Sequence, residues 1–193
     1  YTITPTAIVT GAVCATQSAA AAGNLTINGT LASGGVATLD VPRAVTVTST
    51  GNDSTVNVTI YGTDVYGKSL VWSTAGPNAS FTTSAKAFKT VTRVAVDTAV
   101  VSTLIAIGTG DRFGFPLKVA KRSDVQVFWD NALITTNSGF SVADATGSAK
   151  SGDVRGTYST QSAATASRVL DMVIFSADPD TSDGLYGTDQ FTS

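Results

Sequence analysis

The residues best suited to chemistry are three aspartates near the C-terminal end, Asp178, Asp180 and Asp183, which precede Gly184. Closely spaced carboxylates before a glycine are the kind of ligand that Ca²⁺ takes in protein loops. Compared with the helix–loop–helix calcium pattern, the run has one residue too many before its third aspartate and lacks a bidentate glutamate. We therefore weigh a weak calcium site against a plain acidic surface loop, and favour the loop.

Catalytic side chains are scarce. The sequence contains no histidine, and all 14 of its acidic residues are aspartate. Histidine is the usual general base, a common zinc ligand and the middle member of Ser-His-Asp and Cys-His arrangements. Most of the aspartates stand in turn sequences such as Asn52-Asp53 and Asp130-Asn131, where turn capping explains them. These observations predict a protein that is not an enzyme and has no cofactor.

Two smaller features lack the context that chemistry needs. Gly108, Gly110 and Gly114 have the wrong spacing for a phosphate-binding loop, and no Gly-Lys-Ser/Thr follows them. We interpret them as a turn that ends the first sheet. Cys14, the single cysteine, lies in an apolar run with no histidine to activate it, so it is predicted to be a buried, inert thiol.

The charge balance argues against two classes of partner. Charged residues make up 13% of the 193-residue chain, and the net charge is -2, so there is no basic surface for nucleic acid. No apolar run approaches the roughly 18 residues of a membrane span. We predict a soluble protein with neither a nucleic-acid nor a membrane partner.

The elements that must carry these residues are predicted to be strands. Apolar and hydroxyl residues alternate with period 2, the pattern of half-buried antiparallel strands, and Val45 and Val47 fall on one face. A Gly-Asn-Asp turn at 51–53 predicts a hairpin, and Tyr66-Gly67 predicts another turn. The expected strands of this group span residues 36–41, 44–49, 55–61, 68–72, 88–96 and 101–107, the last two forming a pair.

The second half has more aromatic and basic residues. Residues 125–129 and 132–135 predict a hairpin around Asp130-Asn131, and further strands are expected near 154–158 and 168–175. Together these patterns predict an all-β protein: an antiparallel β-sandwich of immunoglobulin-like build with a second β-rich part and little or no helix. The expected divisions are an N-terminal extension with the first strands (1–35), the sandwich (36–110), a second part that stands alone or completes the same domain (111–177), and an Asp/Gly-rich tail (178–193).

Several stretches of the chain resemble a β-rich module of tailed-phage structural proteins. They are GAVCATQS (11–18), GNLTING (23–29), ATLDVPRAVTVTS (37–49), VTIYGTD (58–64) and FKTVTRV (88–94). In the second half, GFPLK (114–118) and GDVRGTY (152–158) are similar to the continuation seen in phage head-associated proteins. The resemblance covers most of the chain and is closest to capsid decoration, or cement, proteins.

The resemblance implies a function without chemistry. A decoration protein lies on the capsid exterior of the virion, binds the major capsid protein and stabilises the head through many copies, commonly as a homo-oligomer (dimer or trimer). Aromatic and arginine side chains are enriched in interface cores, and an extended N-terminal segment, residues 1–8, could add a strand to a neighbour. The candidate capsid-interface residues are Tyr1, Ile3, Arg112, Phe113, Phe115, Lys118, Lys121 and Arg122.

Two alternatives stay open at this point. A tail or baseplate component of the virion is the nearest rival, because the sequence scarcely distinguishes the two positions. A secreted adhesin or carbohydrate-binding module is the other, with Tyr61, Tyr66, Trp72 or Trp129 as a platform for stacking on sugars. Core or interface packing is the more frequent role of such aromatic residues.

Overall fold

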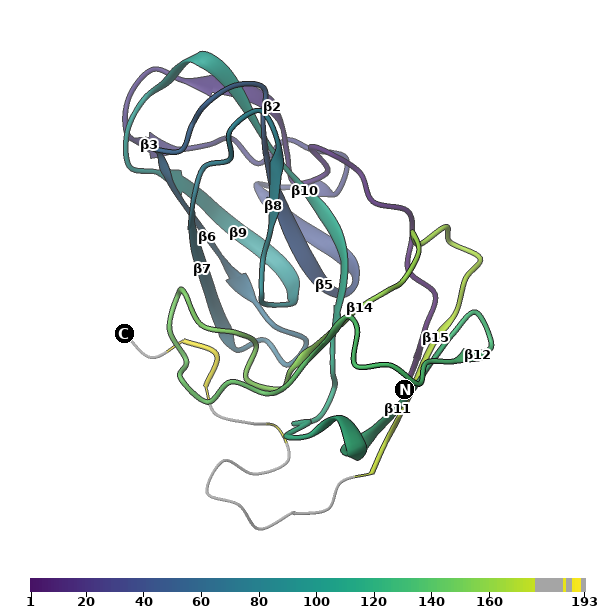
Figure 1. Ribbon diagram of the computed structural model, residues 1–193. Coiled ribbons are helices and arrows are strands. Elements are labelled where there is room, and N and C mark those ends of the chain that lie inside the picture. Colours follow the sequence, from purple (N-terminus) through teal and green to yellow (C-terminus); the bar gives the residue numbers. More distant parts are fainter. Residues whose placement is uncertain (176–185, 187–188, 192–193) are drawn as a thin grey trace.

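The computed structural model describes residues 1–175, 186 and 189–191, and the regular structure in them is almost entirely β (Figure 1). A single 3₁₀ turn, Arg122–Asp124, is the exception among the described residues. The strands are β1 (Thr2–Ile3), β2 (Cys14–Ala19), β3 (Gly23–Asn24), β4 (Ala32–Ser33), β5 (Val36–Ser49), β6 (Asn57–Thr63), β7 (Ser69–Ala75), β8 (Phe81–Thr83), β9 (Phe88–Val96), β10 (Val100–Gly114), β11 (Val125–Trp129), β12 (Ala132–Leu133), β13 (Phe140–Ser141), β14 (Thr157–Ser159) and β15 (Leu170–Ile174). The prediction of an all-β fold with little or no helix is confirmed.

The larger sheet is antiparallel and curls into a sandwich-like unit (Figure 1). Its strands follow the order β13-β14-β10-β5-β9-β6-β7, and β2, β3, β4 and β8 pair at the sides of this path. The unit has two layers, one with β9, β6 and β7 and the other with β10 and β8, and the strand β5 belongs to both. Its first half pairs with β9 and its second half with β10 and β8, and the register shifts between Thr38 and Arg43. Pro42 lies in this interval and donates no backbone hydrogen bond, which suits a break in the ladder.

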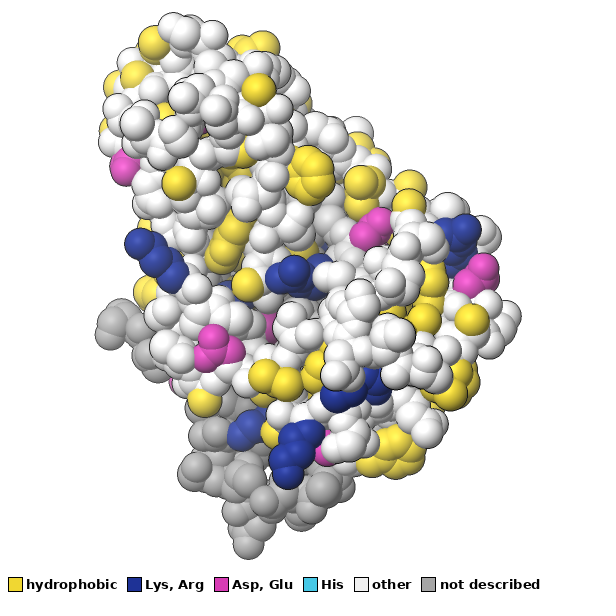
Figure 2. Space-filling view, in the orientation of Figure 1, with side chains coloured by type: hydrophobic (Ala, Val, Ile, Leu, Met, Phe, Trp, Pro, Cys, Tyr) yellow, Lys and Arg dark blue, Asp and Glu magenta, His cyan; other side chains and the backbone are white. Residues whose placement is uncertain are grey.

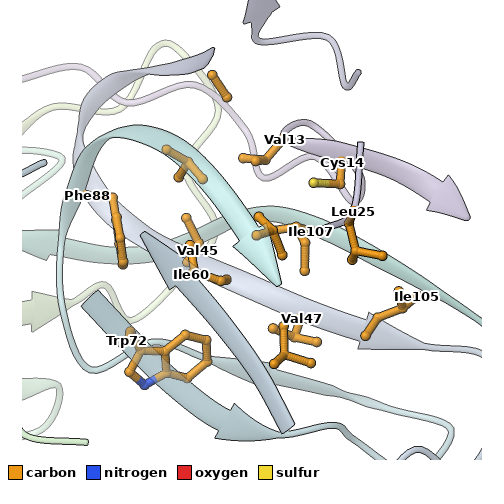
Figure 3. Packing of buried hydrophobic residues seen from close by; sticks show 14 of the residues in the cluster. Val13, Cys14, Leu25, Val45, Val47, Ile60, Trp72, Phe88, Ile105 and Ile107 are labelled. Atoms are coloured by element: carbon orange, nitrogen blue, oxygen red, sulfur yellow. The ribbon is translucent and has the colours of Figure 1, made fainter. Parts of the chain in front are cut away.

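The first core fills the space between the two layers (Figure 3). Val45 and Val47 of β5 point into it together with Ile105 and Ile107 of β10, and Trp72 of β7 closes it from the other layer. The four aliphatic side chains have no exposed surface. Burying a side chain of this size contributes about 1.5–3 kcal/mol relative to leaving it in water. The period-2 alternation read from the sequence is therefore the alternation between core and outer face.

Two predicted strand pairings are wrong. The strands β5 and β6 do not form a hairpin around residues 51–53, because β9 lies between them, and β9 does not pair with β10, because β5 lies between them. Each short connection instead crosses from one layer to the other. The crossing after β5 is fixed by the buried Asp53 carboxylate, which accepts hydrogen bonds from the hydroxyls of Ser49 and Thr103 at 2.5 and 2.6 Å.

Two predicted turns are confirmed. Gly67, in the turn that joins β6 to β7, has a φ of +76°, and the side chain of Asp64 accepts the backbone N–H of Tyr66 across it. Asp130 and Asn131, between β11 and β12, have φ values of 53° and 64°. Positive φ at both central residues is the geometry of a type I′ hairpin, which favours Asn and Asp.

The predicted turn at Gly108–Gly114 is absent, because β10 runs straight through it. Glycine is required here by close packing: a Cβ on Gly108 would lie 2.4 Å from the carbonyl oxygen of Val9, and one on Gly114 would lie 2.6 Å from Cβ of Ala87. The glycines let other chain segments cross the strand at close range. The strand β10 continues beyond these glycines, out of the sandwich and into the second part of the molecule.

The second part is built on a four-stranded antiparallel sheet in the order β1-β15-β11-β12. Its core contains Phe113 from the end of β10, Trp129 from β11 and Leu170 from β15. Residues 1–35 contribute strands to both parts: β1 pairs with β15, while β2, β3 and β4 pair with strands of the sandwich. The predicted strand donor at residues 1–8 thus uses Thr2–Ile3 within its own chain. The N-terminus lies beside β15 (Figure 1).

Candidate interaction surface

The four-stranded sheet has one face in the second core and one face in water. Val127 and Met172 point inward and are buried, whereas the alternate residue Val173 is 45% exposed. Phe128 pairs with Leu133 across the β11–β12 hairpin, and Leu133 is 48% exposed. Phe175 follows β15 and is also exposed. We call the set Phe128, Leu133, Val173 and Phe175 the apolar face.

The apolar face follows from the local sequence. In residues 125–129 and 170–174 every second position is apolar, as expected for one buried face, but Phe128 and Val173 add apolar side chains on the other face. Figure 2 shows hydrophobic side chains at the surface over the ends of β11, β12 and β15. An exposed group of this kind on a rigid sheet is typical of a protein-interaction site.

The charge on this face is small. The register places Asp171 opposite Phe128 and Thr2, and the Thr2 hydroxyl donates a hydrogen bond to its carboxylate. Among the described residues of these paired strands, Asp171 is the charged one on the apolar face. An ion pair at its border joins Arg168 to Asp130 at 3.7 Å. The face therefore suits a mainly apolar partner surface that offers a hydrogen-bond donor to Asp171.

A second exposed apolar region lies on the outer side of the sandwich. Phe81 of β8 is 68% exposed and pairs with Thr48 of β5, which in turn pairs with Ala106 of β10. Leu104, two residues before Ala106, is also exposed. The residues between these two large side chains, Thr48 and Ala106, are small.

The predicted interface residues divide into two groups. Ile3, Phe113 and Phe115 are buried in the second core, so these three side chains are not surface residues of this chain. The reason is that the end of β10 leads into the second core, and β1 presents Ile3 to the same core. The aromatic content that suggested an interface is the signature of a core as well.

The basic residues of the same segment are held by the chain itself. Arg122 donates to the carbonyl oxygens of Val125 and Ile134 and so fastens the β11–β12 hairpin. Arg112 donates to the Ser159 hydroxyl at 3.1 Å. The remaining predicted residues are a half-buried Lys118, an exposed Lys121 and a Tyr1 that is 44% exposed. Tyr1 directly precedes β1, which is the edge strand of the four-stranded sheet.

The aromatic platform for sugars is not formed by the tryptophans. Trp72 and Trp129 are 6% and 5% exposed, and Trp129 donates its indole N–H to the Ser162 hydroxyl. The ring of Tyr61 is covered by the guanidinium of Arg93, whose Cζ lies 3.6 Å from the ring centroid. This arrangement removes the support for a carbohydrate-binding site on these three rings.

A network of buried charges lies where the two parts meet, and sequence reasoning missed it. Arg155 forms an ion pair of 2.9 Å with Asp64, and both side chains are almost fully buried. Lys86 and Asp153 are also buried, and burial lowers the pKa of Lys86 to about 8. Burial raises the pKa of Asp153, while the nearby Arg155 charge acts in the opposite direction.

Arg43 forms a second buried site of this kind. Its guanidinium has no exposed surface, donates to the carbonyl oxygens of Gly110 and Thr6 at 2.9 Å, and pairs with Asp111 at 2.8 Å. Burial alone would raise the pKa of Asp40, but hydrogen bonds from Thr6 and the Arg43 charge 3.3 Å away together outweigh it, so the pKa lies below its usual value. These contacts join β5, β10 and the N-terminal segment.

Two kinds of chemistry remain, metal binding and thiol reactivity. In the described ranges, no three residues of the kinds His, Cys, Asp and Glu come together as a metal site would require. The calcium candidates Asp178, Asp180 and Asp183 lie outside the described residues. The prediction of a buried thiol is confirmed, and burial raises the pKa of Cys14 to about 12.

Comparisons with known proteins add no identity: no protein-family model, no curated protein and no solved structure matches this chain. The described residues also contain no helix that is long and apolar enough to cross a membrane. The fold and the apolar face therefore define the class only as an all-β, sandwich-like protein with a candidate interaction surface.

Proposed function

We propose that this chain is a structural component of a tailed-phage virion that decorates the capsid exterior, binds the major capsid protein and stabilises the head. The sequence resemblance suggests the family. The observation that supports the proposal most directly is the apolar face, because a decoration protein needs a rigid surface that docks on the shell. No catalytic step enters this function.

The scaffold behind the apolar face is suited to such docking. The four-stranded sheet packs on the second core, and the hairpin that carries Leu133 is fastened by Arg122, whose guanidinium donates to the carbonyl oxygen of Ile134 at 2.6 Å. A partner would therefore meet side chains whose positions are fixed before binding. Pre-organisation of this kind lowers the entropy cost of association.

The test uses capsids of the phage that encodes this chain, assembled without it. Purified chain is added, and binding is followed by co-sedimentation and electron microscopy, with resistance of the capsids to heat as the second readout. Leu133→Asp together with Val173→Asp places two charges on the apolar face and should lower capsid affinity at least about 10-fold. Phe81→Asp, on the outer side of the sandwich, is the matched control and should bind like the wild type.

Each outcome of this experiment supports the proposal or refutes a named part of it. Binding to capsids that is lost with Leu133→Asp/Val173→Asp and kept with Phe81→Asp supports the proposal. Capsids that are equally heat-resistant with and without the chain would refute the stabilising role. Attachment to tails instead of capsids would refute the location, and loss of binding only with Phe81→Asp would move the docking surface to the sandwich.

A further inference from the structure

Asp171 is an unusual residue for a central strand of a sheet. Aspartate is depleted in strands, and the described aspartates that lie within strands are Asp40 of β5, Asp111 of β10 and Asp171 of β15. Asp40 and Asp111 both pair with Arg43, at 3.3 and 2.8 Å, which gives each of them a structural role. Asp171 lies on a strand that has neighbours on both sides, and it has no such role.

No cation of the chain compensates the Asp171 carboxylate. In the described residues its hydrogen-bond partner is the hydroxyl of Thr2, and no lysine or arginine forms an ion pair with it. Arg168, at the border of the apolar face, is already paired with Asp130. The sequence segments outside the described residues contain no lysine or arginine. A compensating cation can therefore come only from another molecule.

Asp171 lies among the side chains of the apolar face. The strand registers place Phe128 opposite it on one side and Thr2 on the other, and Phe128 is in turn opposite Leu133. Side chains that are directly opposite on neighbouring strands have Cβ atoms about 4.5–5.5 Å apart. A partner that covers the apolar face must therefore also take water from the Asp171 carboxylate. Burying a carboxylate without a counter-charge is costly, so a stable contact needs a cation at this point.

A second copy of this chain is poorly suited to the apolar face. Two copies in an isologous contact present the same patch to each other. In the described residues this patch offers the carboxylate of Asp171 but no unpaired lysine or arginine. Such a contact would bury two acidic groups without a counter-charge, and like charges across an interface are unfavourable. The face is thus complementary to a different surface, one that supplies a positive charge.

We infer that the capsid surface that meets the apolar face carries an arginine, which pairs with the Asp171 carboxylate and stacks on the Phe128 ring within an otherwise apolar contact. This inference rests on the proposed function. Arginine fits better than lysine, because its planar guanidinium can pair with a carboxylate and lie on an aromatic ring at the same time. The chain itself contains this arrangement: Arg43 pairs with Asp111, and its Cζ lies 5.2 Å from the centroid of the Phe113 ring.

The test measures the affinity of chain variants for capsids assembled without the chain, by quantitative co-sedimentation. Asp171→Asn keeps an acceptor for the Thr2 hydroxyl but removes the charge, so capsid affinity should fall at least about 10-fold. The affinity of the wild type should also fall more steeply with added salt than that of Asp171→Asn. Asp97→Asn is the matched control, because it removes the same charge from an exposed position of the sandwich, and it should bind like the wild type.

A second comparison tests whether one guanidinium makes both contacts. Phe128→Leu keeps an apolar side chain but removes the ring, and should weaken binding about 3-fold. Combined with Asp171→Asn it should cost less than the product of the two separate losses, because both changes act on the same group. Losses that multiply would overturn the shared arginine. Pretreating the capsids with phenylglyoxal, which modifies arginine, should lower wild-type affinity to that of Asp171→Asn; affinity that survives this treatment would exclude an arginine.

Failure of this inference is distinguishable from failure of the proposed function. A wild-type chain that does not bind capsids refutes the proposed function, and the inference with it. Capsid binding by the wild type that Asp171→Asn leaves unchanged, with the same salt dependence, overturns the inference alone. If Asp171→Asn does not fold, Asp171→Thr gives the same comparison, since it places a strand-forming residue opposite Thr2.

Discussion

Replacing Arg43 with methionine should destabilise the whole molecule. The side chain lies where β5, β10 and the N-terminal segment meet, and its Cζ is 5.2 Å from the centroid of the Phe113 ring. Methionine keeps much of the apolar contact but removes the charge and the donors. The carbonyl oxygens of Gly110 and Thr6 lose a partner, and the Asp111 carboxylate loses its ion pair.

The size of the effect can be worked out from these contacts. Breaking a fully buried ion pair costs about 3–5 kcal/mol, because one charge stays buried without a partner. The carboxylates of Asp40 and Asp111 keep 20% and 19% of their side-chain surface exposed, so water partly replaces the guanidinium. We expect the free energy of unfolding to fall by about 2–4 kcal/mol. For a chain of this length the midpoint of thermal unfolding should drop by about 4–16 °C.

The assay uses the two tryptophans, because Trp72 lies in the first core and Trp129 in the second. Urea unfolding is followed by fluorescence in the single-tryptophan backgrounds Trp72→Phe and Trp129→Phe. Arg43→Met should shift both transitions to lower urea concentration, whereas the exposed Arg93→Met should shift them by about 0.5–1 kcal/mol at most. A loss below about 1 kcal/mol, or a shift confined to one tryptophan, would refute the role assigned to Arg43.

Three further predictions concern buried groups. Burial lowers the pKa of Lys86 from 10.5 to about 8, so between these values the unfolded chain holds a proton that the folded chain has lost. The free energy of unfolding should therefore rise by on the order of 1 kcal/mol between about pH 7.5 and 9 in urea titrations, and Lys86→Met should abolish the rise; a flat profile in the wild type would contradict the shift. Gly108→Ala should cost about 1–3 kcal/mol, since its Cβ would lie 2.4 Å from the Val9 carbonyl oxygen, with the exposed Ser102→Ala in the same strand as the control; equal losses in thermal melts would count against the packing argument. Cys14 should resist a thiol reagent at pH 8 in the folded protein and react fully in denaturant, because burial raises its pKa to about 12, and rapid labelling without denaturant would disprove the burial.

The strands could be predicted from the sequence, but their partners could not. Alternating valines and threonines identify β5 and its faces, since period 2 is a local property of the chain. Which strand lies beside β5 depends on whether the connection at residues 51–53 turns back or crosses to the other layer. A Gly-Asn-Asp sequence is compatible with both. The carboxylate of Asp53 decides between them only through Thr103, which is 50 residues away.

The candidate site was harder to predict than the fold, for a related reason. Phe113 and Phe115 suggested an interface, but aromatic residues fill cores and interfaces alike, and only the path of β10 separates the two. Buried charges such as Lys86 are rare, so no sequence rule points to them. The apolar face carried a local signal, because Phe128 and Val173 occupy positions where alternation predicts polar residues.

The strand β10 also has a mechanical consequence. At about 3.3 Å per residue, its 15 residues span about 50 Å, and they pass from the first core into the second. Its ladders with β2 and β5 at one end and β14 at the other run along the direction in which the two parts would be pulled apart. Tension applied in that direction loads many hydrogen bonds at once instead of opening them one after another. We therefore expect β10 to transmit a force applied to the four-stranded sheet into the hydrogen bonds of the sandwich.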